Sequence, residues 1–165
     1  IDYHCESRTL WVRMGGDQAV CDSIAGDINQ FLDDPTLNRM PPEQSNQNWA
    51  DLGAFRFGGP KRDTIIKVPL TLDRMVHLAQ WCDDHADQVC LHCSVAGAMG
   101  WLACQSDFLV DVDSFLAKSE MQGLVVRGQL PSSGSCVAGI HRFGPIQSAI
   151  KDAMDPPGRF PSFAG

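Results

Sequence analysis

Apolar and polar positions recur along the chain with two periods, which predicts short strands alternating with amphipathic helices. Runs rich in apolar and β-branched residues predict five strands, at 9–14, 64–70, 88–95, 99–104 and 124–127. Apolar residues at helical spacing predict helices at 17–32, 43–52, 71–82, 111–121 and 143–154. The third and fourth strands are separated only by a short turn and are expected to form a hairpin.

This order of elements indicates an α+β fold. We expect an antiparallel or mixed sheet with helices on one face, in a ferredoxin-like arrangement. The 165 residues fit a single domain spanning residues 1–165. Residues 33–62 form a long connection with little periodicity, and such connections tend to be functional or mobile.

The last predicted helix carries one apolar stripe. The stripe comprises Phe143, Ile146, Ile150 and Met154, with Ile150 near its centre. A stripe of this kind is typical of a helix that packs on a sheet. We therefore expect Ile150 to be buried.

Charge and cysteine content narrow the class of protein. The net charge of −7 argues against nucleic acid or an anionic membrane surface as a partner. No apolar run approaches the length of about 18 residues that a membrane span needs.

The seven cysteines are odd in number and lie mostly in apolar runs, so we expect reduced thiols in a cytoplasmic protein. The chain begins at Ile1 without a leader, and we expect it to be a fragment of a longer protein.

A cluster of metal-ligand residue types occupies one short segment. It consists of Cys82, His85, Cys90, His92 and Cys93. Zinc needs four ligands that converge, but on a strand Cys90 and Cys93 point to opposite faces, while Cys90 and His92 share a face. We predict no metal site, with Cys82 and Cys93 packed in the core as small apolar groups.

Motifs for phosphate binding and for nucleophilic catalysis are missing from the sequence. The segment at 97–100 is only GxxG, and no G-x-x-x-x-G-K-[ST], G-x-G-x-x-G or G-x-S-x-G pattern is present. The five histidines have no clear nucleophile beside them and are expected to be surface or structural residues. The chain is therefore expected to hold no dinucleotide through such a glycine-rich cradle and to contain no catalytic residue.

The segment 151–160 is the most specific part of the sequence. It reads K-D-A-M-D-P-P-G-R-F, in which Pro156 stops the helix and Pro157-Gly158 fits the central pair of a type II turn. The segment resembles K-x-x-x-D-P-x-G-x-F-N-P-G, which closes FAD-linked oxidases of the vanillyl-alcohol-oxidase type. After the Phe, this chain has Pro161-Ser162-Phe163 where the family has Asn-Pro-Gly.

Three other segments are similar to the FAD-binding subunits of glycolate oxidases and occur in the same order. L-W-V-R-M-G-G at 10–16 resembles L-x-V-R-L-x-G, and I-K-V-P-L at 66–70 resembles part of W-R-I-S-L-P. G-A-M-G-W-L at 97–102 resembles W-G-G-A-L-R-W-L. With the tail, these segments extend over nearly the whole chain.

The resemblance implies a C-terminal cap domain that helps to shape a flavin site for the oxidation of glycolate to glyoxylate. FAD would bind to an N-terminal FAD domain that is absent from this sequence, and the cap alone would be inactive. The implied partners are that FAD domain, a second flavin subunit and an iron–sulfur subunit. The alternative is a stand-alone α+β module for ligand binding or regulation.

Two cations lie inside apolar strands, namely Lys67 and Arg127. Most charges on half-buried strands face solvent. The functional interpretation is that one of them lines a cleft facing the flavin domain and holds a carboxylate substrate through charge-assisted hydrogen bonds. The sequence leaves open which of the two does so.

Overall fold

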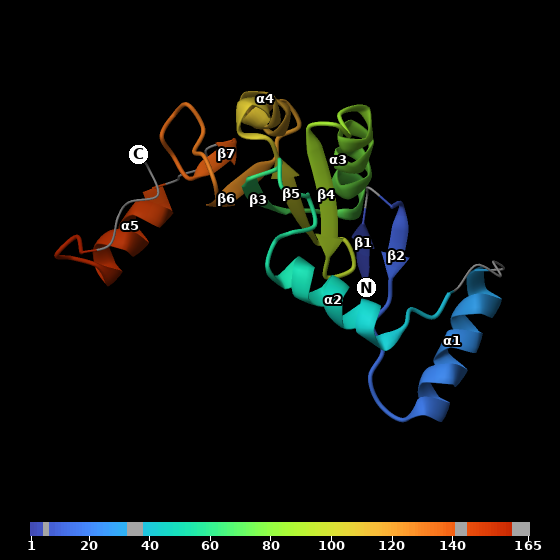
Figure 1. The fold of residues 1–165 in the computed structure, drawn as a ribbon. Helices are drawn as coiled ribbons and strands as arrows, with labels where there is room; N and C mark the ends of the chain where they lie inside the picture. Colours follow the sequence, from blue (N-terminus) through green and yellow to red (C-terminus); the bar gives the residue numbers. More distant parts are fainter. Residues whose placement is uncertain (5–6, 33–37, 141–144, 160–165) are drawn as a thin grey trace.

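The protein is built on one antiparallel sheet of seven strands, seen in a computed structural model that describes residues 1–4, 7–32, 38–140 and 145–159 (Figure 1). The strands are β1 (Asp2–His4), β2 (Thr9–Trp11), β3 (Thr64–Pro69), β4 (Val89–Ser94), β5 (Met99–Cys104), β6 (Gln122–Arg127) and β7 (Val137–Gly139). Their order across the sheet is β2-β1-β4-β5-β3-β6-β7. The helices are α1 (Gln18–Leu32), α2 (Pro42–Gly53), α3 (Leu72–Asp84), α4 (Leu109–Lys118) and α5 (Pro145–Met154), with a 3₁₀ turn η1 (Ser106–Phe108) before α4.

The centre of the sheet is a split β-α-β-β-α-β unit. Along the chain it runs β3-α3-β4-β5-α4-β6, and in space its strands lie in the order β4-β5-β3-β6, all antiparallel. This is the ferredoxin-like arrangement, so the predicted α+β fold is confirmed. The start of α3 also follows the sequence prediction. The Thr71 side chain accepts a hydrogen bond from the Arg74 N–H and is the N-cap of the helix.

One face of the sheet forms the hydrophobic core. Alternate residues of the central strands, such as Ile66, Leu91 and Leu102, are completely buried there. They pack against α3 and α4, whose Leu78 and Leu116 are also fully buried. The two core helices therefore lie on one face, as the sequence predicts, while α2 lies on the other side (Figure 1).

Short strands at both edges extend the sheet beyond the predicted five. The predicted strand at 9–14 is confined to β2, which pairs with β1, and β7 pairs with β6. Neither β1 nor β7 is predicted from the pattern, because three residues are too few to show a period of two. β1 lies on β4 with His4 opposite His92.

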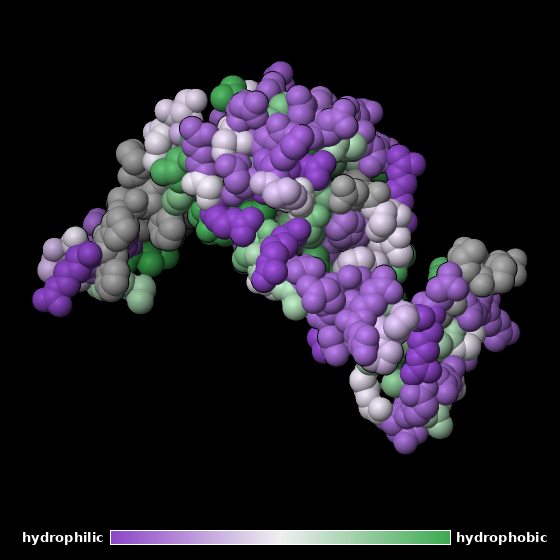
Figure 2. Space-filling model, in the orientation of Figure 1, coloured by the Kyte–Doolittle hydropathy of each residue, from purple (hydrophilic) through white to green (hydrophobic). Residues whose placement is uncertain are grey.

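Two amphipathic helices do not pack on the sheet. α1 begins where Asp17 Oδ1 accepts a hydrogen bond from Ala19 N–H, yet none of its residues is buried, and Phe31 is 87% exposed. In α5, Ile150 is 53% exposed and Met154 is 82% exposed. The prediction that Ile150 is buried against the sheet is wrong; Phe143 and the side chain of Ile146 lie outside the described residues. Both helices stand clear of the main body in Figure 2.

The end of α5 carries a turn, but the predicted type II turn centred on Pro157-Gly158 is wrong, because Pro157 takes the third position, where a type II turn needs a positive φ. Asp155 O accepts a hydrogen bond from Gly158 N–H, so Pro156 and Pro157 are the central pair, and Gly158 follows with a φ of 65°. The Asp155 carboxylate accepts a hydrogen bond from Arg159 N–H and pairs with Lys151 one turn earlier. Asp155 thus joins the last turn of the helix to the segment that leaves it.

No helix in the described part of the chain has the length and hydropathy to cross a membrane.

Candidate functional site

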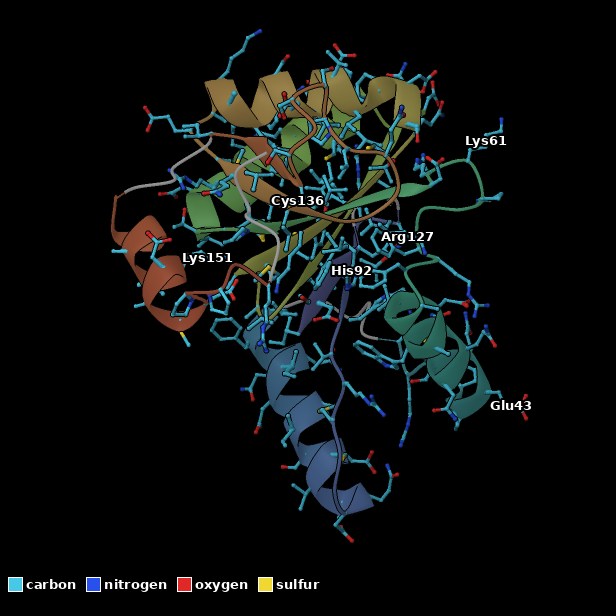
Figure 3. The ribbon with its side chains drawn as sticks, turned by 90° about the vertical axis from the view of Figure 1, so that its left-hand side faces the viewer. Glu43, Lys61, His92, Arg127, Cys136 and Lys151 are labelled. Carbon is cyan, nitrogen blue, oxygen red and sulfur yellow. The ribbon has the colours of Figure 1, made fainter. Side chains whose placement is uncertain are left out.

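The sheet face opposite α3 and α4 carries charged and aromatic side chains beside apolar ones such as Ile65 and Ala103. Because directly paired residues of antiparallel strands share a face, the strand register defines one row across it. The row runs from β6 to β1 through Leu124, Lys67, Trp101, His92 and His4. We call this surface the open face. Figure 3 shows His92 and Arg127 on the side of the sheet that also carries α2.

Lys67 lies near the middle of the open face. It is half-buried on the central strand β3, and its Nζ lies 5.5 Å from the centre of the Trp101 ring. This distance suits a cation–π contact. Within the described ranges, no carboxylate forms an ion pair with Lys67. Its charge is therefore balanced only by the face of an aromatic ring, which leaves it able to attract an anion.

Arg127 lies on the same side of the sheet but has a different environment. Its Nη1 donates to Ala54 O at 3.3 Å and its Nη2 donates to Phe55 O at 2.9 Å. These carbonyls lie at the C-terminal end of α2, which carries a partial negative charge. Arg127 thus holds α2 and the following residues against the end of β6.

A hollow of about 630 Å³ opens beside Arg127. It is lined by Asp51, Phe55, Arg56, Gly59, Pro60, Arg62, Asp63 and Arg127. Arg56 pairs with Asp51 at 3.6 Å, and the Ser106 hydroxyl donates to the Asp63 carboxylate, which lowers the pKa of Asp63. Three arginines against two carboxylates give this hollow a local positive balance in an acidic protein.

His92 is the most enclosed polar group of the open face. Its side chain is 5% exposed, and its Nε2 lies 3.4 Å from Asp2 Oδ2. The rings of Phe57, His4 and Trp11 surround it, with centroids 5.6, 5.9 and 6.4 Å away. Burial lowers the pKa of His92, and the nearby His4 adds to this effect, while Asp2 acts in the opposite direction.

The cysteines occupy the places that strand alternation predicts. Cys82 and Cys93 belong to the buried core, whereas Cys90 points to the other side of β4. Burial raises the pKa of Cys93 and of Cys104 to about 12, so both remain thiols. No disulfide joins the cysteines in the described part of the chain, and no group of three or more His, Cys, Asp or Glu side chains there could hold a metal ion.

The structure brings the two predicted cations to one face and connects them through aromatic contacts. The Phe55 ring, next to the carbonyl that Arg127 binds, lies 5.2 Å from Trp101, which lies under Lys67. His92 and Asp2 also belong to this surface, and the sequence pattern does not predict either of them there. The alternation in 88–95 predicts that His92 and Cys93 point to opposite faces of the sheet. The contact of His92 with Asp2 could not be predicted in this way, because it depends on the pairing of β1 with β4.

Comparisons of the chain with protein-family models, with curated proteins and with solved structures find no match.

Proposed function

We propose that the chain is the cap domain of an FAD-linked oxidase subunit, similar to the FAD-binding subunit of glycolate oxidase. The observation that carries the proposal is the difference between the two faces of the sheet. One face is covered by α3 and α4, and the other carries Lys67, which has no carboxylate partner among the described residues and lies over the Trp101 ring. A cap needs such a second face to enclose a substrate site. The tail at 151–159 supplies the independent sequence support.

In this proposal Lys67 binds the carboxylate of a 2-hydroxy acid such as glycolate. Its ammonium group provides a charge-assisted hydrogen bond, and the Trp101 ring keeps it partly out of water, which strengthens the attraction. Arg127 has the supporting role of holding α2 and the hollow in place, since both its terminal nitrogens bind carbonyl oxygens.

The flavin would be held by another domain. A dinucleotide cradle needs a glycine-rich turn between a strand and a helix. Here β3 passes into α3 through Leu70 and Thr71 without a glycine. Gly15-Gly16 does lie between β2 and α1, but the Asp17 carboxylate accepts the Ala19 N–H at the start of α1 and would repel a phosphate there. These residues do not fit FAD. When bound to its own domain, the flavin would accept the hydride from glycolate and give glyoxylate.

The same proposal accounts for the exposed apolar helices. The stripes of α1 and α5 would be buried against the FAD domain of the full subunit. A second flavin subunit and an iron–sulfur subunit would carry the electrons onward. We place the assembly in the cytoplasm, in keeping with buried cysteines such as Cys93 and Cys104 that form no disulfide.

The second candidate is a stand-alone module that binds a small anion. The hollow lined by Arg56, Arg62 and Arg127 favours it. The two candidates differ in the gene, because only the oxidase requires a coding sequence for a flavin domain upstream of Ile1. A gene whose reading frame begins close to Ile1 would favour the second candidate.

The test of the proposed function uses the full-length subunit in its complex. Replacing Lys67 with Met keeps the length of the side chain and removes its charge, so glycolate should bind more weakly. We expect KM for glycolate to rise by about ten- to a hundredfold, the usual effect of losing a charged hydrogen bond. Lys61→Met, at an exposed position, should leave KM unchanged. Equal kinetics for the two variants would remove Lys67 from the substrate site.

A further inference from the structure

The hairpin of β1 and β2 forms one edge of the sheet and has few backbone contacts to it. Each strand has three residues, and among the described residues β1 pairs with β4 at Tyr3–Cys93 and His4–His92, with one further backbone hydrogen bond from Ala96 N–H to Ile1 O. Leu10 on β2 is 61% exposed. A strand pair of this size is marginally stable on its own. Its position therefore depends on side-chain contacts with the rest of the sheet.

On the open face these contacts involve titratable groups. The Asp2 carboxylate reaches His92, and the His4 ring stacks on Trp11 with centroids 5.4 Å apart and planes 21° apart. His4 is 8% exposed and His92 is 4% exposed. On this face the hairpin is thus attached to β4 through two enclosed imidazoles and one carboxylate, while Tyr3 packs on the core on the other face and Arg8 pairs with Asp83 of α3.

His92 has an incomplete set of hydrogen-bond partners. Its Nε2 faces Asp2, and its Nδ1 is buried without a hydrogen-bond partner among the described residues. In the neutral ring that Nδ1 can remain an acceptor, but in the charged ring both nitrogens carry a proton. A buried N–H with no acceptor is unfavourable, so the closed arrangement suits only the neutral ring.

We propose that the β1–β2 hairpin is a pH-sensitive switch, in which protonation of His92 detaches the hairpin from β4. Detachment exposes the edge of the sheet and the aromatic side chains of the open face. The device is separate from the proposed oxidase function and would operate in either candidate protein.

Titratable and aromatic groups from several elements surround His92. β1 contributes Asp2 and His4, and β3 contributes Lys67 two strands away. Trp11 from β2, Trp101 from β5 and Phe57 contribute only aromatic rings. Asp2 favours the charged His92 ring and His4 opposes it, but the loss of hydration on burial is the larger effect, so a charged His92 is better accommodated in water than under the closed hairpin.

The direction of the pH dependence follows from the pKa. Burial keeps the pKa of folded His92 below the ordinary value of 6.5. The closed hairpin is thus fully favoured above pH 6.5, and this contribution is lost as the pH falls below that value.

The experiment is a pH titration of the isotopically labelled 165-residue chain by NMR, from pH about 8 to about 5. We expect the His92 ring to titrate below 6.5, and the amides of β1 and β2 to lose their native shifts in the same transition. Amides of β3 and β5 should keep theirs. A hairpin that stays native while His92 becomes charged would overturn the proposal. Both signals come from the native protein, so the result does not depend on any variant.

Two variants sharpen the test. His92→Gln keeps an N–H donor for Asp2 but cannot gain a proton, so hairpin release should shift to lower pH by at least about one unit, a tenfold change in proton concentration. His77→Gln should reproduce the native titration, because His77 is exposed on α3 and stacks on Phe115. Release of the His92→Gln hairpin at the native pH would also overturn the proposal.

Discussion

The two faces of one sheet differ in almost every physical respect. On the core face, Ile66, Leu91 and Leu102 are completely buried under α3 and α4. One residue along the same strands, Lys67, His92 and Trp101 make up the open face, where covering is partial and comes from aromatic rings and the β1–β2 hairpin. The core face stabilises the fold, whereas the open face holds groups whose charge is poorly balanced inside the chain. Such groups are typical of a surface that binds something else.

The largest expected effect is on the core face. Leu102→Ala removes a fully buried side chain and should lower the free energy of unfolding by about 2–5 kcal/mol, through lost burial and a residual cavity. The matched change Ile150→Ala on the exposed stripe of α5 should stay within about 0.5 kcal/mol of the native value. Denaturant unfolding of the three proteins makes the measurement. Comparable losses at both positions would mean that α5 packs on the sheet after all.

An intermediate effect is expected where α2 meets the open face. Arg127→Ala removes two hydrogen bonds to the end of α2, so this helix should loosen while the central strands remain unchanged. The bonds are exposed, so we expect a loss of about 1 kcal/mol. Hydrogen exchange should be faster over residues 42–57.

Arg56→Ala is the control for Arg127→Ala, because Arg56 forms only an exposed pair with Asp51 in the same hollow. If both variants leave exchange over residues 42–57 unaltered, Arg127 does not hold α2.

The smallest expected effect is a difference in reactivity between buried and half-buried thiols, measured without altering the fold. Cys93 and Cys104 are buried on the core face with pKa values of about 12, whereas Cys21 and Cys136 are only half-buried. Native alkylation followed by mass spectrometry should modify Cys21 and Cys136 first. Cys93 and Cys104 should react only on unfolding, because the thiolate is the reactive form. Rapid native labelling of Cys93 would show that the core face opens readily.

Much of the fold could be predicted from the sequence. Alternation in 64–70 and 88–95 shows which residues share a face, and the single-turn link between β4 and β5 predicts their hairpin. The burial of Cys93 and the outward position of Lys67 follow from that pattern. The pattern does not show which part of the protein covers a given apolar stripe. The stripe at Ile150 looks the same whether it packs on this sheet or on another domain, and the structure leaves it exposed.

The candidate site depends on contacts that are distant in sequence. The His92 ring contacts the Asp2 carboxylate, which lies about ninety residues earlier in the chain. Arg127 holds α2 through the carbonyl oxygens of Ala54 and Phe55. β1 has three residues and the 54–63 segment has no periodicity, so local pattern gives no sign of either contact. For this reason Lys67 and Arg127 could be proposed from the sequence, whereas their different environments could not.

The central claim is that the chain caps a flavin site. The most direct measurement is the flavin content of the natural polypeptide that contains this sequence, together with the response of that flavin to glycolate. The account predicts one FAD for each polypeptide, held outside the 165 residues, and bleaching of the oxidised-flavin absorbance when glycolate is added without oxygen. A natural polypeptide that carries no flavin, or a flavin that glycolate leaves oxidised in the assembled complex, would contradict it.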